Sequence, residues 1–235
     1  MVEQQDRSGL IKEFFALPLK KKEIAFTYLG YSGIILRVED RAVAVDIGFG
    51  LQKVDMNVFS KLDLLLFTHS HSDHYNRART RGILEKSDVH IVAQHQVAED
   101  LKDRAPPNRL TSATPKKPIG AGGFEIAAVV GIHPRPISIF RIKKDKFTVF
   151  HGGDSGYAPV KEYPAEIAFL PTGSPSPSCS PESALRFARD LKPRIAVAMH
   201  GNSAQMNKFK NLVEKEMPNT TIIIPKKYQV ETLTL

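Results

Sequence analysis

The sequence predicts a layered α/β fold. Short apolar runs that are typical of strands alternate along the chain with stretches of helical periodicity. Groups of three neighbouring strands recur in both halves of the chain and give it a rough two-part symmetry. The chain has 235 residues, of which 42% are hydrophobic, so it can form an extensive core. No change in composition marks a linker between separate domains.

The first twenty or so residues stand apart from the rest. Apolar residues recur there at helical spacing, and Pro18 and a run of three lysines follow them. The apolar stripe consists of Leu10, Ile11, Phe14, Phe15 and Leu17. We expect residues 1–22 to form a helical extension of a main domain at residues 23–235. It would pack onto that domain or onto a second subunit, with a membrane-surface helix as the alternative.

Apolar runs bounded by turns predict the strands. We expect them at residues 24–29, 34–39 and 42–46, at 62–67, at 124–130, 137–142 and 146–150, and at 165–170, 194–199 and 221–224. Helical spacing predicts helices at residues 78–85, 96–103, 182–191 and 205–215. The third helix has Ser180 at its N-cap and Pro181 at its first position, and both residue types favour a helix start.

Four side chains that can bind metal lie directly after the apolar run 62–67. Residues 69–74 have the sequence His-Ser-His-Ser-Asp-His. Alternate residues of an extended chain share a face, so His69 and His71 can bind one ion. If the chain then turns, Asp73 and His74 can reach a second ion at the short spacing of a two-metal site. Burying these groups together without a cation would be costly.

A centre with two ions needs further ligands from other strand ends. Three candidates each follow another predicted strand, namely His133, Asp154 and His200. Pro134 interrupts a regular ladder directly after His133. Glycines around Asp154 let the backbone approach closely, so that its carboxylate can bridge two ions. The sequence therefore predicts a dinuclear hydrolytic centre.

These motifs resemble those of the metallo-β-lactamase superfamily. The chain has that superfamily's ligand order, His-x-His-x-Asp-His followed by His, Asp and His, and the resemblance extends from about residue 24 to 235. It implies a four-layer αββα sandwich. The ligands that it implies are His69, His71 and His133 for one ion, Asp73, His74 and His200 for the other, and Asp154 as the bridge. Asp73 and Asp154 are the carboxylates that we expect to serve in catalysis.

Within the superfamily, three segments are similar to one branch. They are residues 28–33, 68–69 and 153–157, and the branch includes ascorbate-6-phosphate lactonase and N-acyl-phosphatidylethanolamine phospholipase D. That branch usually carries His at the position of Tyr31, inside a Gly-His-x-Gly turn. The departure weakens any transfer of the branch's substrate to this chain, but it leaves the metal ligands unaffected.

Single residues disfavour two neighbouring activities of the same fold. Two-metal zinc β-lactamases use Cys between their last two histidine ligands. The only cysteine here, Cys179, is expected in a loop rather than at a strand end, so Asp154 fits that position better. Iron-dependent flavodiiron oxidases usually have Glu at the position of His71, so His71 argues against that activity.

Histidine and carboxylate ligands suit Zn, which we expect first, and also Mn, Fe or Ni. Two such divalent ions would share a hydroxide that attacks a carbonyl or phosphoryl centre. Asp46 follows directly on a predicted strand, and it is a candidate to orient a ligand imidazole.

The chain is basic and favours anionic partners. It has 33 Lys and Arg against 25 Asp and Glu, a formal net charge of +8. We expect Arg135, two residues after His133, to hold an anionic group of a small-molecule substrate. Arg77, Arg79 and Arg81 follow the cluster closely and are the alternatives for this contact. The lysine pairs are spread along the chain, so a nucleic-acid partner is possible but unsupported.

The same sequence bears on location. No segment approaches the roughly 20 apolar residues that span a bilayer. The first residues lack the apolar stretch of a signal peptide, and a single cysteine excludes an internal disulfide. We therefore expect a cytoplasmic protein, with a homo-oligomer as one option for its assembly.

Three functions are compatible with this pattern. The preferred one is a metal-dependent hydrolase of a small-molecule ester, lactone or phosphoester. The second is a nuclease that cleaves RNA, although the intervals between the ligands leave no room for a large RNA-binding insertion. The third is a metal-binding protein without catalysis, against which the full ligand set argues.

Overall fold

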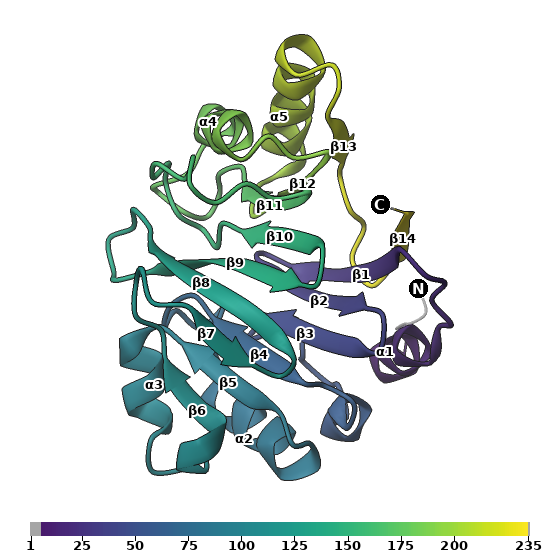
Figure 1. Ribbon diagram of the computed structural model, residues 1–235, viewed down its shortest axis with the longest axis vertical. Coiled ribbons are helices and arrows are strands. Elements are labelled where there is room, and N and C mark those ends of the chain that lie inside the picture. The colour runs from purple at the N-terminus through teal and green to yellow at the C-terminus, as the bar shows by residue number, and fades with distance from the viewer. Residues whose placement is uncertain (1–5, 235) are drawn as a thin grey trace.

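The computed structural model describes residues 6–234, in which two seven-stranded sheets pack face to face between helices (Figure 1). Figure 1 shows α2 (Arg77–Lys86) and α3 (His95–Leu101) on the outer side of the first sheet. It shows α4 (Pro181–Leu191) and α5 (Ser203–Glu216) on the outer side of the second sheet. The layers are therefore helix, sheet, sheet and helix, and the αββα sandwich expected from the sequence is confirmed.

The first sheet combines antiparallel and parallel strands. Its strands are β1 (Glu23–Gly30), β2 (Gly33–Val38), β3 (Arg41–Val45), β4 (Leu64–Phe67), β5 (His90–Ala93), β6 (Leu110–Ser112) and β14 (Val230–Thr234). Their order is β14-β1-β2-β3-β4-β5-β6. The pairs from β14 to β3 are antiparallel, and those from β3 to β6 are parallel.

The second sheet repeats this pattern. Its strands are β7 (Ile119–Ala121), β8 (Phe124–Val130), β9 (Ser138–Lys144), β10 (Phe147–His151), β11 (Ile167–Pro171), β12 (Ile195–Met199) and β13 (Thr221–Ile223). Their order is β13-β12-β11-β10-β9-β8-β7. Strands β7 to β10 pair antiparallel, and strands β10 to β13 pair parallel.

The predicted elements are all present, with ends shifted by at most two residues. The strand predicted at 34–39 ends at Val38, because Glu39 has a φ of 55° and starts the turn to β3. The predicted cap of α4 is confirmed, since the Ser180 side chain accepts a hydrogen bond from the Ser183 amide. Strands β5, β6, β7 and β14 were not predicted, and two 3₁₀ turns at Met56–Phe59 and Pro107–Arg109 complete the described elements.

Apolar side chains fill three layers of the sandwich. Between the two sheets, Phe26 of β1 meets Phe169 of β11 edge to face, with ring centroids 5.0 Å apart. A second cluster lies between the first sheet and its helices, and a third lies between the second sheet and α4 and α5. This rigid core fixes the strand ends from which the site is built.

The helix predicted near the N-terminus is α1 (Arg7–Ala16). Ile11, Phe14 and Phe15 are buried in the cluster that covers the first sheet. The Arg37 guanidinium of β2 donates to the carbonyls of Phe14, at 2.9 Å, and Leu17, at 2.6 Å. These bonds satisfy carbonyl groups at the helix end that have no partner within the helix. The described part of α1 thus packs onto the sandwich.

We propose that residues 1–22 are an extension of the domain at 23–235 and not a separate unit. Residues 1–5 and 235 of these two ranges lie outside the described residues. Among residues 6–234, every helix falls short of the length and apolar character that a bilayer span requires.

Removing the Phe14 ring should show how much the packing of α1 contributes to stability. Phe14 is fully buried, so Phe14→Ala is expected to lower the free energy of unfolding by about 3–5 kcal/mol. Lys12→Ala on the exposed face of the same helix should change it by less than about 0.5 kcal/mol. Denaturant unfolding measures both values, and equal midpoints for the two variants would mean that α1 does not dock in solution.

Candidate metal centre

The fold brings the seven predicted ligands into two adjacent groups. One atom from each of His69, His71, His133 and Asp154 lies within 4.8 Å of the others. In the second group, one atom from each of Asp73, His74 and His200 also lies within 4.8 Å of the others. The two groups draw on the segments that follow β4, β8, β10 and β12, so both sheets contribute.

The Asp154 carboxylate lies between the two groups. Its Oδ1 is 3.7 Å from His69 Nε2, and its Oδ2 is 3.2 Å from His133 Nε2, both in the first group. The same Oδ2 is 3.8 Å from His74 Nε2 and 3.9 Å from His200 Nε2, both in the second group. A carboxylate in this place is within reach of both groups.

Three buried histidines direct Nε2 toward this space. His74 Nδ1 lies 2.7 Å from Asp46 Oδ2, and His200 Nδ1 lies 3.3 Å from the Gly173 carbonyl oxygen. Both partners only accept, so each ring donates from Nδ1, and Nε2 is the nitrogen that remains to bind a metal ion. His69 Nδ1 is 3.1 Å from the Thr68 hydroxyl, which itself donates to Asp46, so the same tautomer follows.

The groups that face this space lack hydrogen-bond partners. His69 Nε2, His74 Nε2, His200 Nε2 and Asp154 Oδ1 are buried and have no partner among the described residues. Unpaired buried polar atoms are rare because each costs about 1–3 kcal/mol. A divalent cation would satisfy these lone pairs, so the residues fit a metal ion.

Asp46 is the predicted orienting residue, and the structure places it directly behind His74. Its Oδ1 accepts from the Thr68 amide at 2.8 Å, and its Oδ2 accepts from the Thr68 hydroxyl at 2.6 Å. The His74 ring is a third donor to Asp46, whose side chain is fully buried. Burial favours the neutral acid, but the nearby His74 ring keeps the pKa of Asp46 below its usual value.

His69, Asp73 and His74 have strongly displaced pKa values. Burial and the neighbouring His74 ring lower the pKa of His69 to about 2. Burial would also lower the pKa of His74, but Asp46 and Asp73 outweigh it and raise that pKa to about 10. Burial opposes ionisation of Asp73, yet the nearby His200 and His74 rings, whose Nε2 atoms lie 3.6 Å and 3.3 Å from Asp73 Oδ2, hold its pKa well below the usual range. Asp73 is thus ionised at neutral pH and attracts a cation.

A second network, which the sequence did not reveal, supports the turn that carries Asp154. His151 is buried, and its Nε2 donates to the Ser32 carbonyl oxygen at 2.8 Å, while its Nδ1 accepts from the Gly153 amide at 3.2 Å. The Ser32 hydroxyl donates to the Gly153 carbonyl oxygen at 2.8 Å. Gly153 has a φ of 58°, which favours glycine there. In the sequence, His151 is distinguished by its position directly before two glycines. This position alone does not predict a role for it.

The proposed substrate contact Arg135 lies at the edge of the site. Its side chain is exposed, and its backbone amide lies 3.1 Å from His133 Nδ1. Its positive charge helps to lower the pKa of His71, after burial and other neighbours. Three other arginines near the cluster have structural partners instead: Arg77 pairs with Asp100, Arg79 donates to the Gly48 carbonyl, and Arg81 pairs with Glu85.

Cys179 lies outside both groups of candidate ligands. Its thiol is buried and donates to the Gly173 carbonyl oxygen at 3.2 Å. Burial raises the pKa of this thiol to about 11, so the metal-binding thiolate form is disfavoured. The loop position expected from the sequence is confirmed.

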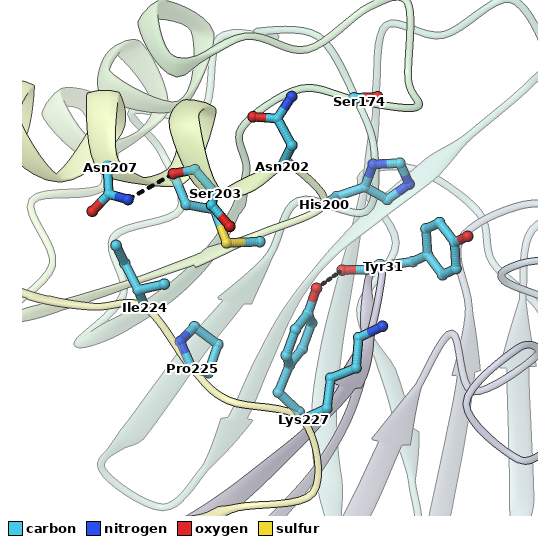
Figure 2. Close-up of a pocket in the computed structure, with 12 residues that line it drawn as sticks. Tyr31, Ser174, His200, Asn202, Ser203, Asn207, Ile224, Pro225 and Lys227 are labelled. Carbon is cyan, nitrogen blue, oxygen red and sulfur yellow. Dashed lines mark hydrogen bonds between the residues drawn. The ribbon is translucent and has the colours of Figure 1, made fainter. Parts of the chain in front are cut away.

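A pocket of about 540 Å³ opens beside His200 (Figure 2). Tyr31 lines it and has a φ of 52°, and its carbonyl oxygen accepts from the His200 amide at 2.9 Å. The Tyr31 ring lies 5.1 Å from that of Phe49 and 5.8 Å from that of His200. Tyr31 therefore supports a candidate ligand and borders the space next to it.

Comparison with known proteins agrees with this geometry. Residues 42–201 match the family model described as beta-lactamase superfamily domain. A protein of Ignicoccus hospitalis named UPF0173 metal-dependent hydrolase is 26% identical over 220 residues, which are 81% of this chain and 90% of that protein. A similarly named protein of Pyrococcus abyssi is 30% identical over 174 residues, or 66% of this chain and 76% of that protein.

A solved structure has the same architecture. It is that of Igni18, described as a novel metallo hydrolase from Ignicoccus hospitalis. The two chains superpose with a TM-score of 0.76 at 25% sequence identity, over 91% of this chain and 99% of that chain.

Asp46→Asn should weaken metal binding through His74. The amide keeps the shape of the side chain but removes the charge that holds the imidazole, so affinity for Zn²⁺ is expected to fall by about 10–100-fold. Asp88→Asn, at a fully exposed aspartate, is the matched control and should leave the affinity unchanged. Competition with a chromophoric chelator measures both, and equal affinities would exclude an orienting role for Asp46.

Proposed function

The chain belongs to the beta-lactamase superfamily, and from this premise we propose that it is a metal-dependent hydrolase with a dinuclear centre. The observation that carries the proposal is the convergence of seven ligand side chains, with three buried Nε2 atoms and one carboxylate oxygen left without partners. The relatives' name, metal-dependent hydrolase, supports the same class of reaction.

We assign the ligands as the two groups suggest. His69, His71 and His133 would hold one ion, Asp73, His74 and His200 the other, and Asp154 both. Bound divalent ions supply an acidified water and positive charge for the developing oxyanion. Zn is proposed first because imidazole nitrogens dominate the ligand set, with Mn, Fe or Ni as alternatives.

The protein's own groups prepare the site for this chemistry. Asp154 is nearly buried and reaches both groups, so it fixes their spacing. Asp73 keeps 23% of its side chain exposed, so it can accept a hydrogen bond from an incoming water and orient it. Asp46 and the Gly173 carbonyl hold the rings of His74 and His200 in the tautomer that leaves Nε2 free.

We propose a small-molecule ester, lactone or phosphoester as substrate. The pocket beside His200, of about 540 Å³, has the size of a small-molecule site. The likeness of residues 28–33 and 153–157 to the lactonase and phospholipase D branch supports lactones and phosphoesters, although Tyr31 replaces that branch's His. The lone buried thiol agrees with action in the cytoplasm.

Metal analysis tests the centre itself. Protein purified without chelator should contain close to two transition-metal equivalents, and His71→Ala should lose most of one. His95→Ala is the matched control because His95 is exposed and lies outside both ligand groups. Elemental analysis by plasma mass spectrometry gives the counts, and wild type and His71→Ala both without metal would refute the dinuclear centre.

Hydrolysis assays test the reaction. We expect turnover of bis-p-nitrophenyl phosphate or of a homoserine lactone, with a loss on the order of 10²-fold or more in Asp154→Ala. Asp88→Ala, at a fully exposed site, should retain the wild-type rate. Cleavage of a short RNA in place of both substrates would favour the nuclease. Two bound metals with no turnover of any of the three would favour a metal-binding protein without catalysis.

A further inference from the structure

We propose that the pocket beside His200 binds an anionic group of the substrate, with Lys227 as its counter-charge. The inference rests on the proposed function in one respect, because it takes His200 to be a metal ligand. It adds the chemical class of the substrate, which would carry a phosphate or a carboxylate. In this arrangement Lys227 determines specificity and the metal ligands carry the reaction.

The pocket borders the candidate metal centre through one candidate ligand and has Lys227 in its lining. His200 lines its wall, and His200 Nε2 lies 3.6 Å from Asp73 Oδ2 in the second ligand group. Figure 2 shows Asn202 and Ser203 of the α5 start on one side and Lys227 on the other. The Lys227 ammonium points toward the side where Tyr31 and His200 lie. A ligand in the pocket would therefore lie between this ammonium and the metal site.

Backbone contacts fix the position of Lys227. Lys227 forms an isolated parallel bridge with Tyr28 of β1, and the next amide, that of Tyr228, donates to the Tyr28 carbonyl at 2.8 Å. The Tyr228 hydroxyl donates to the Gly50 carbonyl at 2.6 Å. The Lys227 side chain lies over Gly30, where an added Cβ would come within 2.9 Å of Cε and 3.2 Å of Nζ. The absence of a side chain at residue 30 thus leaves room for the ammonium.

The charge of the pocket is positive and has no local partner. Among residues 6–234, Lys227 is the only Lys or Arg that lines it, and no Asp or Glu does. Among the described residues, no carboxylate lies within ion-pair distance of Lys227, whereas Lys102, Lys144 and Lys208 all pair with acids. A pocket with one unpaired cation and no acid attracts anions and disfavours cations.

Polar groups opposite Lys227 suit the same ligand. Ser203 opens the 14-residue helix α5, whose N-terminal end favours negative charge. The Gln205 side-chain oxygen accepts from the amides of Ser174, at 2.9 Å, and Asn202, at 3.0 Å, and so holds this rim in place. The rim is fixed before a ligand arrives, which lowers the entropic cost of binding.

Calorimetric titration of the as-purified protein with inorganic phosphate and with succinate tests the proposal. Lys227→Gln should weaken binding of at least one probe about tenfold, as expected for loss of a charge-assisted contact. Lys226→Gln removes the neighbouring exposed charge, which does not line the pocket, and should change affinity by less than twofold. The probe that loses more affinity identifies the anion as a phosphate or a carboxylate.

Ser203→Asp gives a second, independent measurement. It adds a carboxylate at the start of α5, a position that favours an acid in a helix, so the fold should be retained while both probes bind more weakly. The proposal fails if neither probe binds, or if Lys227→Gln and Ser203→Asp both bind like wild type. Metal content is measured on the same samples. Lys227-dependent binding without metal would refute the proposed function alone, whereas two metals with Lys227-independent binding would refute this inference alone.

Discussion

Asp46 accepts three hydrogen bonds from a fully buried position, and the arrangement of the metal centre depends on them. Two come from Thr68 and fix the start of the segment that carries the first ligand cluster. The third comes from His74 and sets its tautomer. Removing Asp46 would leave buried donors unpaired and would free the ring to rotate. The Asp46 carboxylate, directly after β3, thus links the first sheet to the candidate metal ligands.

The two sheets contribute to the centre through chain segments held in uncommon backbone conformations. Asp46 and His200 have φ values of 50° and 44°, and Tyr31, which supports His200, has 52°. Residues other than glycine rarely adopt such φ values. Each such residue costs on the order of 1–3 kcal/mol of conformational energy, which the surrounding structure has to offset. The core between the sheets supplies this stabilisation because it fixes the strands on either side. The residues with this conformational cost are those that direct candidate ligands toward a common point.

The sequence predicted the parts of the site that depend on neighbours along the chain. The cluster at residues 69–74 was evident from its own spacing, and the long apolar strands were evident from their composition. His133, Asp154 and His200 meet because of the order of the strands in the sheets. The spacing of these residues does not predict that order, so their convergence was predicted from the superfamily resemblance. Short strands such as β6, with three residues, carry too little pattern to be found.

Asp46 was predicted as a supporting residue, but two other supporting contacts could not be predicted because they join distant residues. His151 and Ser32 are 119 positions apart, and Lys227 reaches its place only through pairing with β1. Asp154 has a further consequence of this kind. One of its oxygens lies within 4 Å of candidate ligands in both groups. A rotation of this one side chain would therefore alter the geometry of both halves of the candidate site together.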